Sequence, residues 1–276
     1  MSEVAIGPVV MANRRPLTLI AGMNVLETRD LALQVAERLK READLRGFPL
    51  VFKASFDKAN RSSIHSWRGP GLVGLRWLQD VQDATGLPLI TDIHEAGQAP
   101  AVAEVVDALQ IPAFLCRQTD LLEAACRTGL PLHIKKMQMM AADDMAPLIR
   151  KLDHFGHGGL VLCERGTTHG YGNLVVDFIG MRRLAEHGWP VSFDVTHAVQ
   201  LPGGLGHATG GRRSAIPSLA IAAVATGLAG LFLEVHPEPD QARCDGPCAT
   251  HLDDVGALLD KLRAIDDLAK SWGDAV

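Results

Sequence analysis

The sequence carries no excess of positive charge. Its 276 residues include 27 Lys and Arg against 32 Asp and Glu, which gives a formal net charge of −5. No general electrostatic attraction therefore favours nucleic acid or an anionic membrane, and an anionic ligand would need a local cluster of basic side chains. With 47% hydrophobic and only 5% aromatic residues, the composition is that of a globular enzyme and excludes a disordered or collagen-like chain.

A disulfide framework and an export signal are also missing. The five cysteines form an odd, irregularly spaced set in a chain too long to depend on cross-links, so we expect reduced thiols and a cytoplasmic protein. The first 20 residues show no basic segment followed by an apolar run and a cleavage site. The long uncharged run 215–233 contains Pro217, Gly227 and Gly230, which predicts a helix, a stop and a strand rather than a membrane span.

Short apolar runs alternate with segments of helical character along the whole chain. The runs span 17–22, 49–55, 88–94, 108–114, 131–136, 159–166, 190–197 and 230–237, and the clearest helical segments are 29–46, 121–128, 143–155, 173–187 and 214–227. Strands that are apolar on both faces are typical of a parallel sheet covered by helices. Eight such units favour an α/β fold of the (β/α)8 TIM barrel type over an open doubly wound sheet.

We predict one barrel domain over residues 1–276, because no linker or low-complexity tract divides the chain. Residues 1–16 are expected to form a short N-terminal β-hairpin that covers the N-terminal mouth of the barrel. Residues 17–276 are expected to form the barrel, with a closing helix over 253–272.

Polar residues stand at or just beyond the end of every apolar run. Because barrel enzymes place their catalytic residues at the C-terminal ends of the strands, these residues are candidates for a site. They are Asn24, Glu27, Lys53, Asp92, His94, Glu95, Arg117, Lys135, Lys136, Glu164, Arg165, Asp194, His197, Glu234 and His236. Any one of them alone would more often be a solvated loop charge or a satisfied polar group, but agreement at all eight ends favours a common site.

The segment that follows the second run is long and basic. It places Lys53, Lys58, Arg61 and Arg68 against Asp57 and adds Asn60, Ser62 and Ser63 as hydrogen-bond donors. A connection of this length in a compact barrel is usually a binding loop or disordered. Together with Arg117, Lys136 and Arg165, these cations would repel one another unless anions fill the space between them, which predicts a polyanionic substrate or two anionic substrates.

A second long connection, 201–213, is rich in glycine. It is consistent with a mobile lid, with a phosphate cradle after the seventh strand, or with an ordinary flexible loop.

Several short motifs match known binding patterns, but the surrounding sequence argues against those functions. The GxGxxG pattern over 69–74 does not follow a strand, which argues against dinucleotide binding. Cys244, Cys248 and His251 lack a fourth zinc ligand at a usual spacing. A stronger metal candidate is the set of His197, Glu234 and Asp245, but it is one ligand short unless Asn24 or water completes it, and Asn is a poor ligand for soft divalent metals.

The sequence resembles one family over residues 20–247. The matching segments are IAGMNVLETRD, FKASFDKANRSSIHSWRGPG, ITDIHE, QIPAFLCRQTDL, CERGTT, FDVTHAVQLPGG and LEVHPEPDQARCDGP, in this order, and KASFDKANRSS alone is highly specific. They are similar to the 3-deoxy-D-manno-octulosonate 8-phosphate synthase family. The resemblance implies a homotetramer of (β/α)8 barrels that condenses phosphoenolpyruvate with D-arabinose 5-phosphate and water, releasing phosphate, for lipopolysaccharide biosynthesis.

The resemblance also implies roles for individual residues. Phosphoenolpyruvate would be bound by Lys53, Ser55, Lys58, Asp92, Gln110, Lys136 and Arg165. Arabinose 5-phosphate would be bound by Asn60, Arg61 and Ser62, with Arg117 reaching in from a neighbouring subunit. Catalysis would fall to Asn24, Lys58, His197 and Asp245.

The family divides into metal-dependent members, which carry Cys at the position of Asn24, and metal-independent members, which carry Asn there. Asn24 and the CDGP segment therefore imply a metal-independent enzyme that requires no cofactor. His197, Glu234 and Asp245 would remain as former ligand positions that orient water and the sugar aldehyde.

Met137, His169 and His207 depart from the family pattern near the expected phosphoenolpyruvate pocket and the glycine-rich loop. Three alternatives remain open at this point. The chain could be a related synthase that uses erythrose 4-phosphate or an amino sugar, a Schiff-base aldolase with Lys135 or Lys136, or a non-catalytic barrel that binds sugar phosphates.

Overall fold

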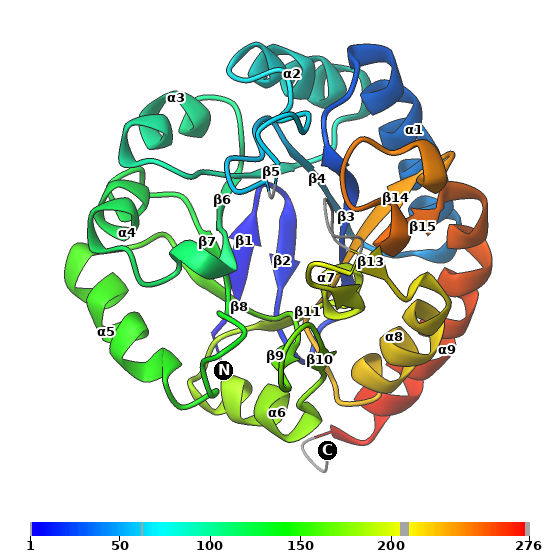
Figure 1. Cartoon of the computed structure of the whole chain (residues 1–276). Helices are drawn as coiled ribbons and strands as arrows, with labels where there is room; N and C mark the ends of the chain where they lie inside the picture. The colour runs from blue at the N-terminus through cyan, green and yellow to red at the C-terminus, as the bar shows by residue number, and fades with distance from the viewer. Residues whose placement is uncertain (1, 62, 205–209, 274–276) are drawn as a thin grey trace.

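A closed parallel barrel forms the centre of the molecule. The computed structural model describes residues 2–61, 63–204 and 210–273. In this part of the chain the barrel strands are β3 (Thr18–Val25), β4 (Leu50–Ser55), β5 (Leu89–Asp92), β6 (Ala108–Ile111), β7 (Leu132–Lys135), β8 (Leu160–Glu164), β11 (Val191–Asp194) and β14 (Gly230–His236). Each pairs in parallel with its neighbours, and β14 pairs with both β3 and β11, which closes the ring (Figure 1). The (β/α)8 TIM barrel prediction is confirmed.

Helices surround the barrel in a ring (Figure 1). They are α1 (Arg29–Arg46), α2 (Val73–Thr85), α3 (Ala99–Ala103), α4 (Thr119–Cys126), α5 (Met145–Phe155), α6 (Phe178–Glu186), α8 (Ile216–Val224) and α9 (Val255–Ser271). Helix α1 has the predicted bounds because Thr28 accepts a hydrogen bond from the Leu31 amide at its start and Gly47 takes a left-handed φ of 68° at its end. Its buried Ala32, Val35, Ala36, Leu39 and Ala43 recur at helical spacing and face the barrel.

The prediction of a helix over 173–187 is wrong for its first five residues. Leu174–Val175 form strand β10, which pairs with β9 (Thr167–Thr168) in a small hairpin beyond the barrel. Helix α6 begins at Phe178 because the Asp177 carboxylate accepts a hydrogen bond from the Gly180 amide at 2.8 Å and caps the helix there.

Short elements complete the loops. They are α7 (Val195–Ala198), β12 (Gln200–Leu201), β13 (Gly210–Gly211), β15 (Thr250–His251) and the 3-10 helices η1 (Ala96–Gln98), η2 (Ala113–Leu115), η3 (Arg213–Ala215), η4 (Pro239–Gln241), η5 (Gly246–Cys248) and η6 (Leu252–Asp254). The uncharged run 215–233 divides into helix α8, a turn at Gly227 with φ 80° and strand β14, as predicted. Within the described residues, no helix has the length and apolar character needed to cross a membrane. All five cysteines are free and buried.

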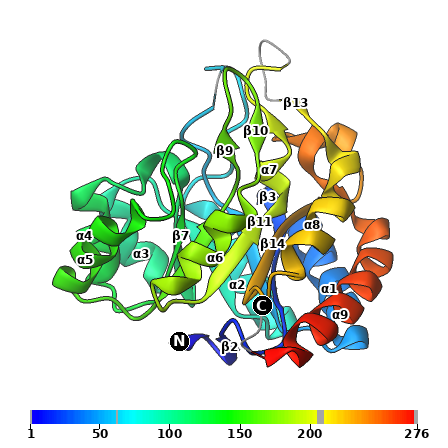
Figure 2. The same cartoon turned by 90° about the horizontal axis from the view of Figure 1, so that it is seen from below.

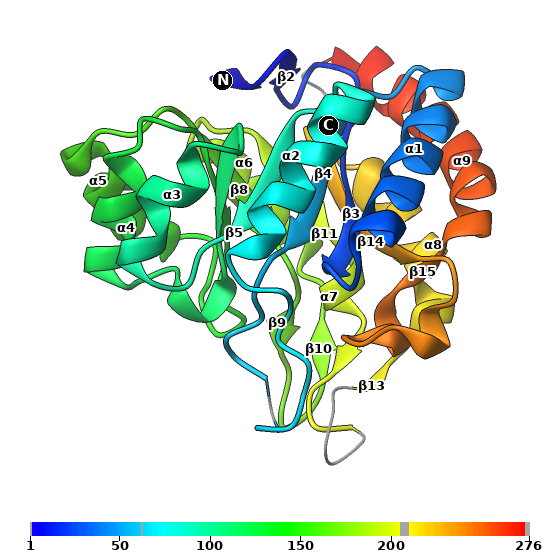
Figure 3. The same ribbon diagram turned by 90° about the horizontal axis from the view of Figure 1, so that it is seen from above.

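The N-terminal hairpin closes one end of the barrel. Strands β1 (Val4–Ile6) and β2 (Val9–Met11) are antiparallel, and in Figures 2 and 3 they lie at the end of the molecule opposite β9, β10 and β13. Val4, Ile6 and Met11 are buried against an apolar cluster inside the barrel, which is formed by Ile20, Val51, Ile90, Ala108, Val161, Ala229 and Phe232. The expected position of the hairpin over the N-terminal mouth is confirmed, and the polar end of the barrel lies on the other side.

Candidate active site

A cavity of about 390 Å³ opens at the C-terminal end of the barrel. Its polar lining includes Lys58, Asn60, Arg61, Asp92, His94, Gln110, Lys135, Arg165, His197 and Asp245. These residues come from the ends of β4, β5, β6, β7, β8, β11 and β14 and from the loops that follow. Of the basic side chains predicted to converge at one barrel mouth, Lys58, Arg61 and Arg165 line this cavity, whereas Lys53, Lys136 and Arg117 do not.

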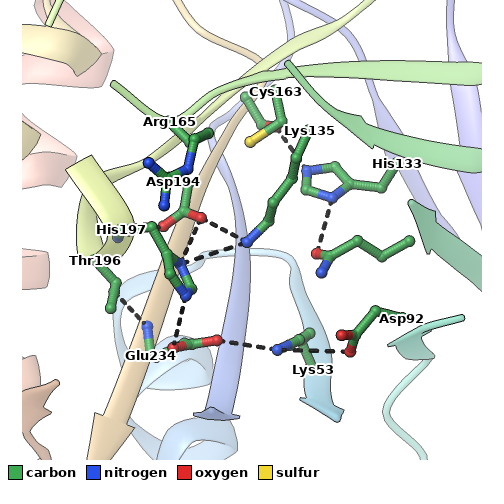
Figure 4. A network of polar contacts seen from close by, with 12 residues as sticks. Lys53, Asp92, His133, Lys135, Cys163, Arg165, Asp194, Thr196, His197 and Glu234 are labelled. Carbon is green, nitrogen blue, oxygen red and sulfur yellow. Dashed lines mark hydrogen bonds and ion pairs between the residues drawn. The ribbon is translucent and has the colours of Figure 1, made fainter. Parts of the chain in front are cut away.

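Most of the deep lysines are paired with buried carboxylates. Lys53 Nζ lies 3.0 Å from Glu234 Oε1, and Lys135 Nζ lies 2.5 Å from Asp194 Oδ2; Figure 4 shows both pairs facing the barrel interior. All four side chains are at most 7% exposed. The expectation that only bound anions would neutralise the converging basic side chains is wrong at this depth. Burying a cation without a partner would cost too much free energy, and carboxylates of the barrel supply the partner.

These pairs keep the buried acids ionised. Burial alone would raise the pKa of Glu234, but Lys53, His197 and Lys58 outweigh it and lower the pKa to about 2. The pKa of Asp92 is held well below its usual range because Lys53 and Lys58 outweigh burial. His197 and Lys135 act in the same way on the pKa of Asp194. The floor of the cavity is therefore charged but nearly neutral in sum.

Three cationic groups that line the cavity are less committed. The guanidinium nitrogens Arg61 Nη1 and Arg165 Nη1 are buried and have no hydrogen-bond partner among the residues described. In the same part of the chain, the amine of Lys58 makes no hydrogen bond or ion pair, although the side chain is only 9% exposed. Burial would lower the pKa of Lys58, but Glu234 and Asp92 outweigh it and raise the pKa, so the amine is cationic. Buried donors of this kind require acceptors, and an anionic ligand would supply them.

Asn24 lies among the three former-ligand candidates. Its amide nitrogen donates to Glu234 Oε2 and, at 3.1 Å, to Asp245 Oδ2. His197 Nε2 lies 3.6 Å from Glu234 Oε2 and 3.8 Å from Asp245 Oδ2. The amide nitrogen thus lies between two carboxylates and donates to both. A metal ion at this position would need a ligand atom that gives an electron pair, which the amide NH2 group does not. No cluster of three or more His, Cys, Asp or Glu among the described residues has the arrangement of a metal site.

Two backbone positions, Gly22 and Asp245, bring the polar groups of the site close together. A side chain at Gly22 would place its Cβ 2.0 Å from the carbonyl oxygen of Lys53, so only glycine lets β3 approach β4 where both strands deliver polar groups. Asp245 takes a left-handed φ of 48°, which is uncommon outside glycine and turns its carboxylate toward Asn24 and Gln200.

Lys135, and not Lys136, faces the cavity. Along β7, His133 and Lys135 point into the barrel and Ile134 packs into the outer core, so Lys136 points outward again. There Lys136 Nζ donates to the Met140 carbonyl at 2.8 Å and lies 3.3 Å from Glu164 Oε2. The alternation of side chains along a strand is the signal that could have identified Lys135 from the sequence.

Two other expected ligands lie beneath the cavity wall. Ser55 is fully buried, accepts a hydrogen bond from Lys53 Nζ at 3.0 Å and donates to Asp92. Lys53 also donates to the carbonyl of Asn24. Ser55 and Lys53 therefore hold Asp92, Asn24 and Glu234 in place from below.

The expected arabinose 5-phosphate residues divide into three groups. Asn60 and Arg61 line the main cavity. Arg117 lies apart from them, in a separate cavity of about 360 Å³ with Met139, Met140 and Lys151. Ser62 lies outside the described residues, as does His207 in the glycine-rich loop.

Gln200 was not predicted from the sequence. It precedes the glycine-rich loop, accepts a hydrogen bond from Arg165 Nη2 at 2.7 Å and donates to Asp245 Oδ2 at 3.3 Å. It thus links the start of this loop to Arg165 and Asp245, and no spacing in the sequence indicates these contacts.

Known proteins are similar to the chain over almost its whole length. The model of the DAHP synthetase I family matches residues 3–271. A protein of Hahella chejuensis named 2-dehydro-3-deoxyphosphooctonate aldolase is 53% identical over 270 residues, which are 98% of this chain and 96% of that protein. Proteins with the same name from Pseudomonas fluorescens Pf-5 and Shewanella amazonensis are 52% and 51% identical, over 98% and 99% of this chain and 96% and 97% of their own lengths. The 2-dehydro-3-deoxyphosphooctonate aldolases are the same enzymes as the 3-deoxy-D-manno-octulosonate 8-phosphate synthases that the motifs resemble. The chain therefore belongs to the DAHP synthetase I family, in the branch of the 2-dehydro-3-deoxyphosphooctonate aldolases.

Proposed function

We propose that the chain condenses phosphoenolpyruvate with D-arabinose 5-phosphate and water, giving 3-deoxy-D-manno-octulosonate 8-phosphate and inorganic phosphate for lipopolysaccharide biosynthesis. The names of relatives at 51–53% identity support this activity. The observation that carries it is a set of cationic groups with unpaired donors around one cavity, namely the amine of Lys58 and the Nη1 atoms of Arg61 and Arg165. Two phosphorylated substrates, one of which also has a carboxylate, are opposite in charge to these groups and supply acceptors for their donors.

Phosphoenolpyruvate is proposed to occupy the deep part of the cavity. Lys58, Gln110 and Arg165 line it and can donate to the phosphate and carboxylate oxygens. Lys135 takes the direct role first expected of Lys136, which supports the loop beside Met140 instead. Lys53, Ser55 and Asp92 contribute by fixing the charges of the floor.

Arabinose 5-phosphate is proposed to bind toward the outer side, at Asn60 and Arg61 and at Ser62 of the same loop. The location of Arg117 in a separate cavity supports the proposal that this residue serves a neighbouring subunit of a homotetramer. Under this proposal, mixing Arg117→Ala subunits with subunits disabled at Lys58 should restore part of the activity, because the intact Lys58 site of an Arg117→Ala subunit would receive Arg117 from its Lys58-disabled neighbour.

The reaction follows from these positions. The donors hold the enol phosphate so that its terminal carbon attacks the aldehyde carbon of the sugar, and the cationic amine of Lys58, directly or through water, gives a proton to the new alkoxide. Water adds to the oxocarbenium-like carbon, and the proton that it loses replaces the one given by Lys58. His197, held at 2.7 Å by Asp194, and Asp245 are placed to orient the water and the aldehyde. The tetrahedral intermediate then loses phosphate by cleavage of its C–O bond.

We also propose that the enzyme requires no metal ion or other cofactor. The donor set supports this, because the amide nitrogen of Asn24 satisfies the carboxylates of Glu234 and Asp245 in place of a cation. A cytoplasmic location is proposed as well, since all five cysteines are free and buried.

The test is phosphate release from phosphoenolpyruvate with arabinose 5-phosphate or with erythrose 4-phosphate. We expect release with the five-carbon sugar and oxygen label from the bridging position of phosphoenolpyruvate in the released phosphate. A preference for erythrose 4-phosphate, or label in the sugar product, would contradict the proposal. Borohydride trapping of Lys135 with substrate would instead support a Schiff-base aldolase, and thermal stabilisation by the substrates without phosphate release would indicate a binding protein.

A further inference from the structure

Beneath the cavity, three strands place a histidine between a glutamine and a serine. Gln110 on β6, His133 on β7 and Ser192 on β11 are each at most 3% exposed. His133 Nδ1 lies 3.2 Å from Gln110 Oε1, and His133 Nε2 lies 2.9 Å from Ser192 Oγ. Both ring nitrogens are therefore engaged. Figure 4 shows His133 beside Lys135.

The environment of His133 keeps the ring neutral and still. The ring is stacked on Phe232 with centroids 5.9 Å apart and an angle of 10° between the planes. Burial and the nearby cation of Lys135 lower the pKa of His133 to about 3. A neutral imidazole carries one N–H, so one ring nitrogen donates and the other accepts. The direction of both hydrogen bonds then depends on a single proton.

We propose that His133 is a positioning residue for phosphoenolpyruvate, an inference that rests on the proposed function. The Ser192 hydroxyl donates to Nε2, which leaves the ring proton on Nδ1, and Nδ1–H donates to Gln110 Oε1. The amide NH2 group of Gln110, which lines the cavity, then faces the substrate and donates to one of its anionic oxygens. The reversed amide would present a carbonyl oxygen to an anion, and this contact would be repulsive.

The tautomer can be measured directly. In protein labelled with nitrogen-15 at histidine, the side-chain signals of His133 can be identified by their loss in His133→Asn. We expect shifts of a neutral ring protonated at Nδ1 near neutral pH. A ring protonated at Nε2, or a doubly protonated ring, would overturn the arrangement, whatever the enzyme's activity.

Steady-state kinetics then test the positioning role. His133→Leu removes both hydrogen bonds while it keeps an apolar side chain of similar bulk, and we expect the KM for phosphoenolpyruvate to rise about tenfold. The KM for arabinose 5-phosphate and kcat should stay within about twofold, because the lost interaction acts on binding of one substrate. Ser192→Ala should give a smaller rise in this KM, about threefold. It removes the hydroxyl that keeps the ring proton on Nδ1, but the imidazole remains and can still donate to Gln110.

A conservative variant and a packing control sharpen the result. His133→Asn carries its amide nitrogen at nearly the position of Nδ1, so it can still donate to Gln110 and should restore most of the affinity. Val161→Ala, in register with His133 on β8 and in the apolar cluster that contains Phe232, removes packing without touching the hydrogen-bond chain and should leave the KM unchanged.

The outcomes separate the inference from the function that it rests on. If the parent chain releases no phosphate from phosphoenolpyruvate with arabinose 5-phosphate, the proposed function fails. If the parent is active but His133→Leu keeps the parent's KM for phosphoenolpyruvate, or matches Val161→Ala, only the positioning role is wrong.

Discussion

The two ends of the barrel are built from the same strands but by opposite means. At the N-terminal end, Ile6 and Met11 of the hairpin are fully buried in an apolar cluster. At the C-terminal end, the buried groups are ion pairs such as Lys53 with Glu234. Phe232 lies at the boundary, since it belongs to the apolar cluster and the amine of Lys135 lies 3.7 Å from the centre of its ring.

The difference separates stability from chemistry. Apolar burial at the closed end stabilises the fold by removing surface from water. Burying charges at the open end costs desolvation free energy, and the ion pairs offset this cost without adding stability. In return, the cavity holds fixed dipoles and hydrogen-bond donors that can bind anions. Substitutions at the closed end should therefore change the free energy of unfolding, and substitutions at the open end should change the rate.

The largest effect is expected at the open end, from Lys58→Met. Loss of the uncommitted amine removes a substrate contact and the proposed proton donor, so kcat/KM should fall about a thousandfold, or about 4 kcal/mol of transition-state stabilisation. Phosphate release measures the rate, and circular dichroism checks the fold. Lys261→Met, at an exposed position of α9, is the matched control and should keep full activity. A loss below about tenfold in Lys58→Met would argue against a direct role for this amine.

At the closed end, Ile6→Ala is expected to act on stability alone. The side chain is fully buried, and its truncation leaves a cavity beneath the hairpin, which should lower the free energy of unfolding by about 3 kcal/mol. Urea unfolding measures this loss, and kcat/KM at a temperature well below the transition should be unchanged. Val10→Ala on the same hairpin, where the side chain is only half-buried, should cost less. A tenfold change in kcat/KM would show that the two ends are coupled.

Between the two ends, His133 should make stability depend on pH. The pKa of this residue is lowered from 6.5 to about 3 by burial and by Lys135, so the unfolded chain takes up a proton below pH 6.5 while the folded chain does not. This contribution to stability is present above pH 6.5 and is lost as the pH falls toward 3.

His133→Asn lacks the titrating group, so between about pH 7 and pH 5 its stability should fall by about 2 kcal/mol less than that of the parent. Urea unfolding at both pH values gives the comparison. Ser192→Ala keeps the ring and should follow the parent. Parallel profiles for the parent and His133→Asn would mean that the folded state binds the proton as readily as the unfolded one.

The smallest effect is expected from chelation. Exhaustive dialysis against a chelator should leave kcat unchanged, because Asn24 supplies to Glu234 and Asp245 the hydrogen bonds that stand in for a cation. Activity lost on chelation and restored by a divalent ion would contradict this expectation. It would also show that the open end depends on a bound ion and not only on its own side chains.

The barrel could be predicted from the sequence because each of its parts has a local signal. Apolar runs that end in polar residues indicated the eight strands, and the Thr28 cap and the glycine at 47 account for the bounds of α1. The start of α6 was missed because the local hairpin of β9 and β10 was not recognised, although Gly170, Gly172 and Asn173 lie in the turn between its strands. Asp177, which caps α6, was a second local signal that the helix begins at Phe178.

The candidate site was predicted less completely. The basic loop after β4 identified Lys58 and Arg61, and the end of β8 identified Arg165. Lys136 was chosen over Lys135 because the alternation of side chains along β7 was not applied. Gln200 and His133 were missed as members of the site because their partners come from other strands and loops.

The sequence by itself determined the fold class, the set of polar groups at the strand ends and the family, because these depend on patterns within short segments and on similarity along the chain. Only the tertiary structure decided which cations are neutralised and which stay available for a ligand. Lys53 meets Glu234 across 181 positions of sequence, and Lys135 meets Asp194 across 59. Such pairs form because closing the barrel brings distant strand ends into one buried volume, where an unpaired charge is too costly to keep.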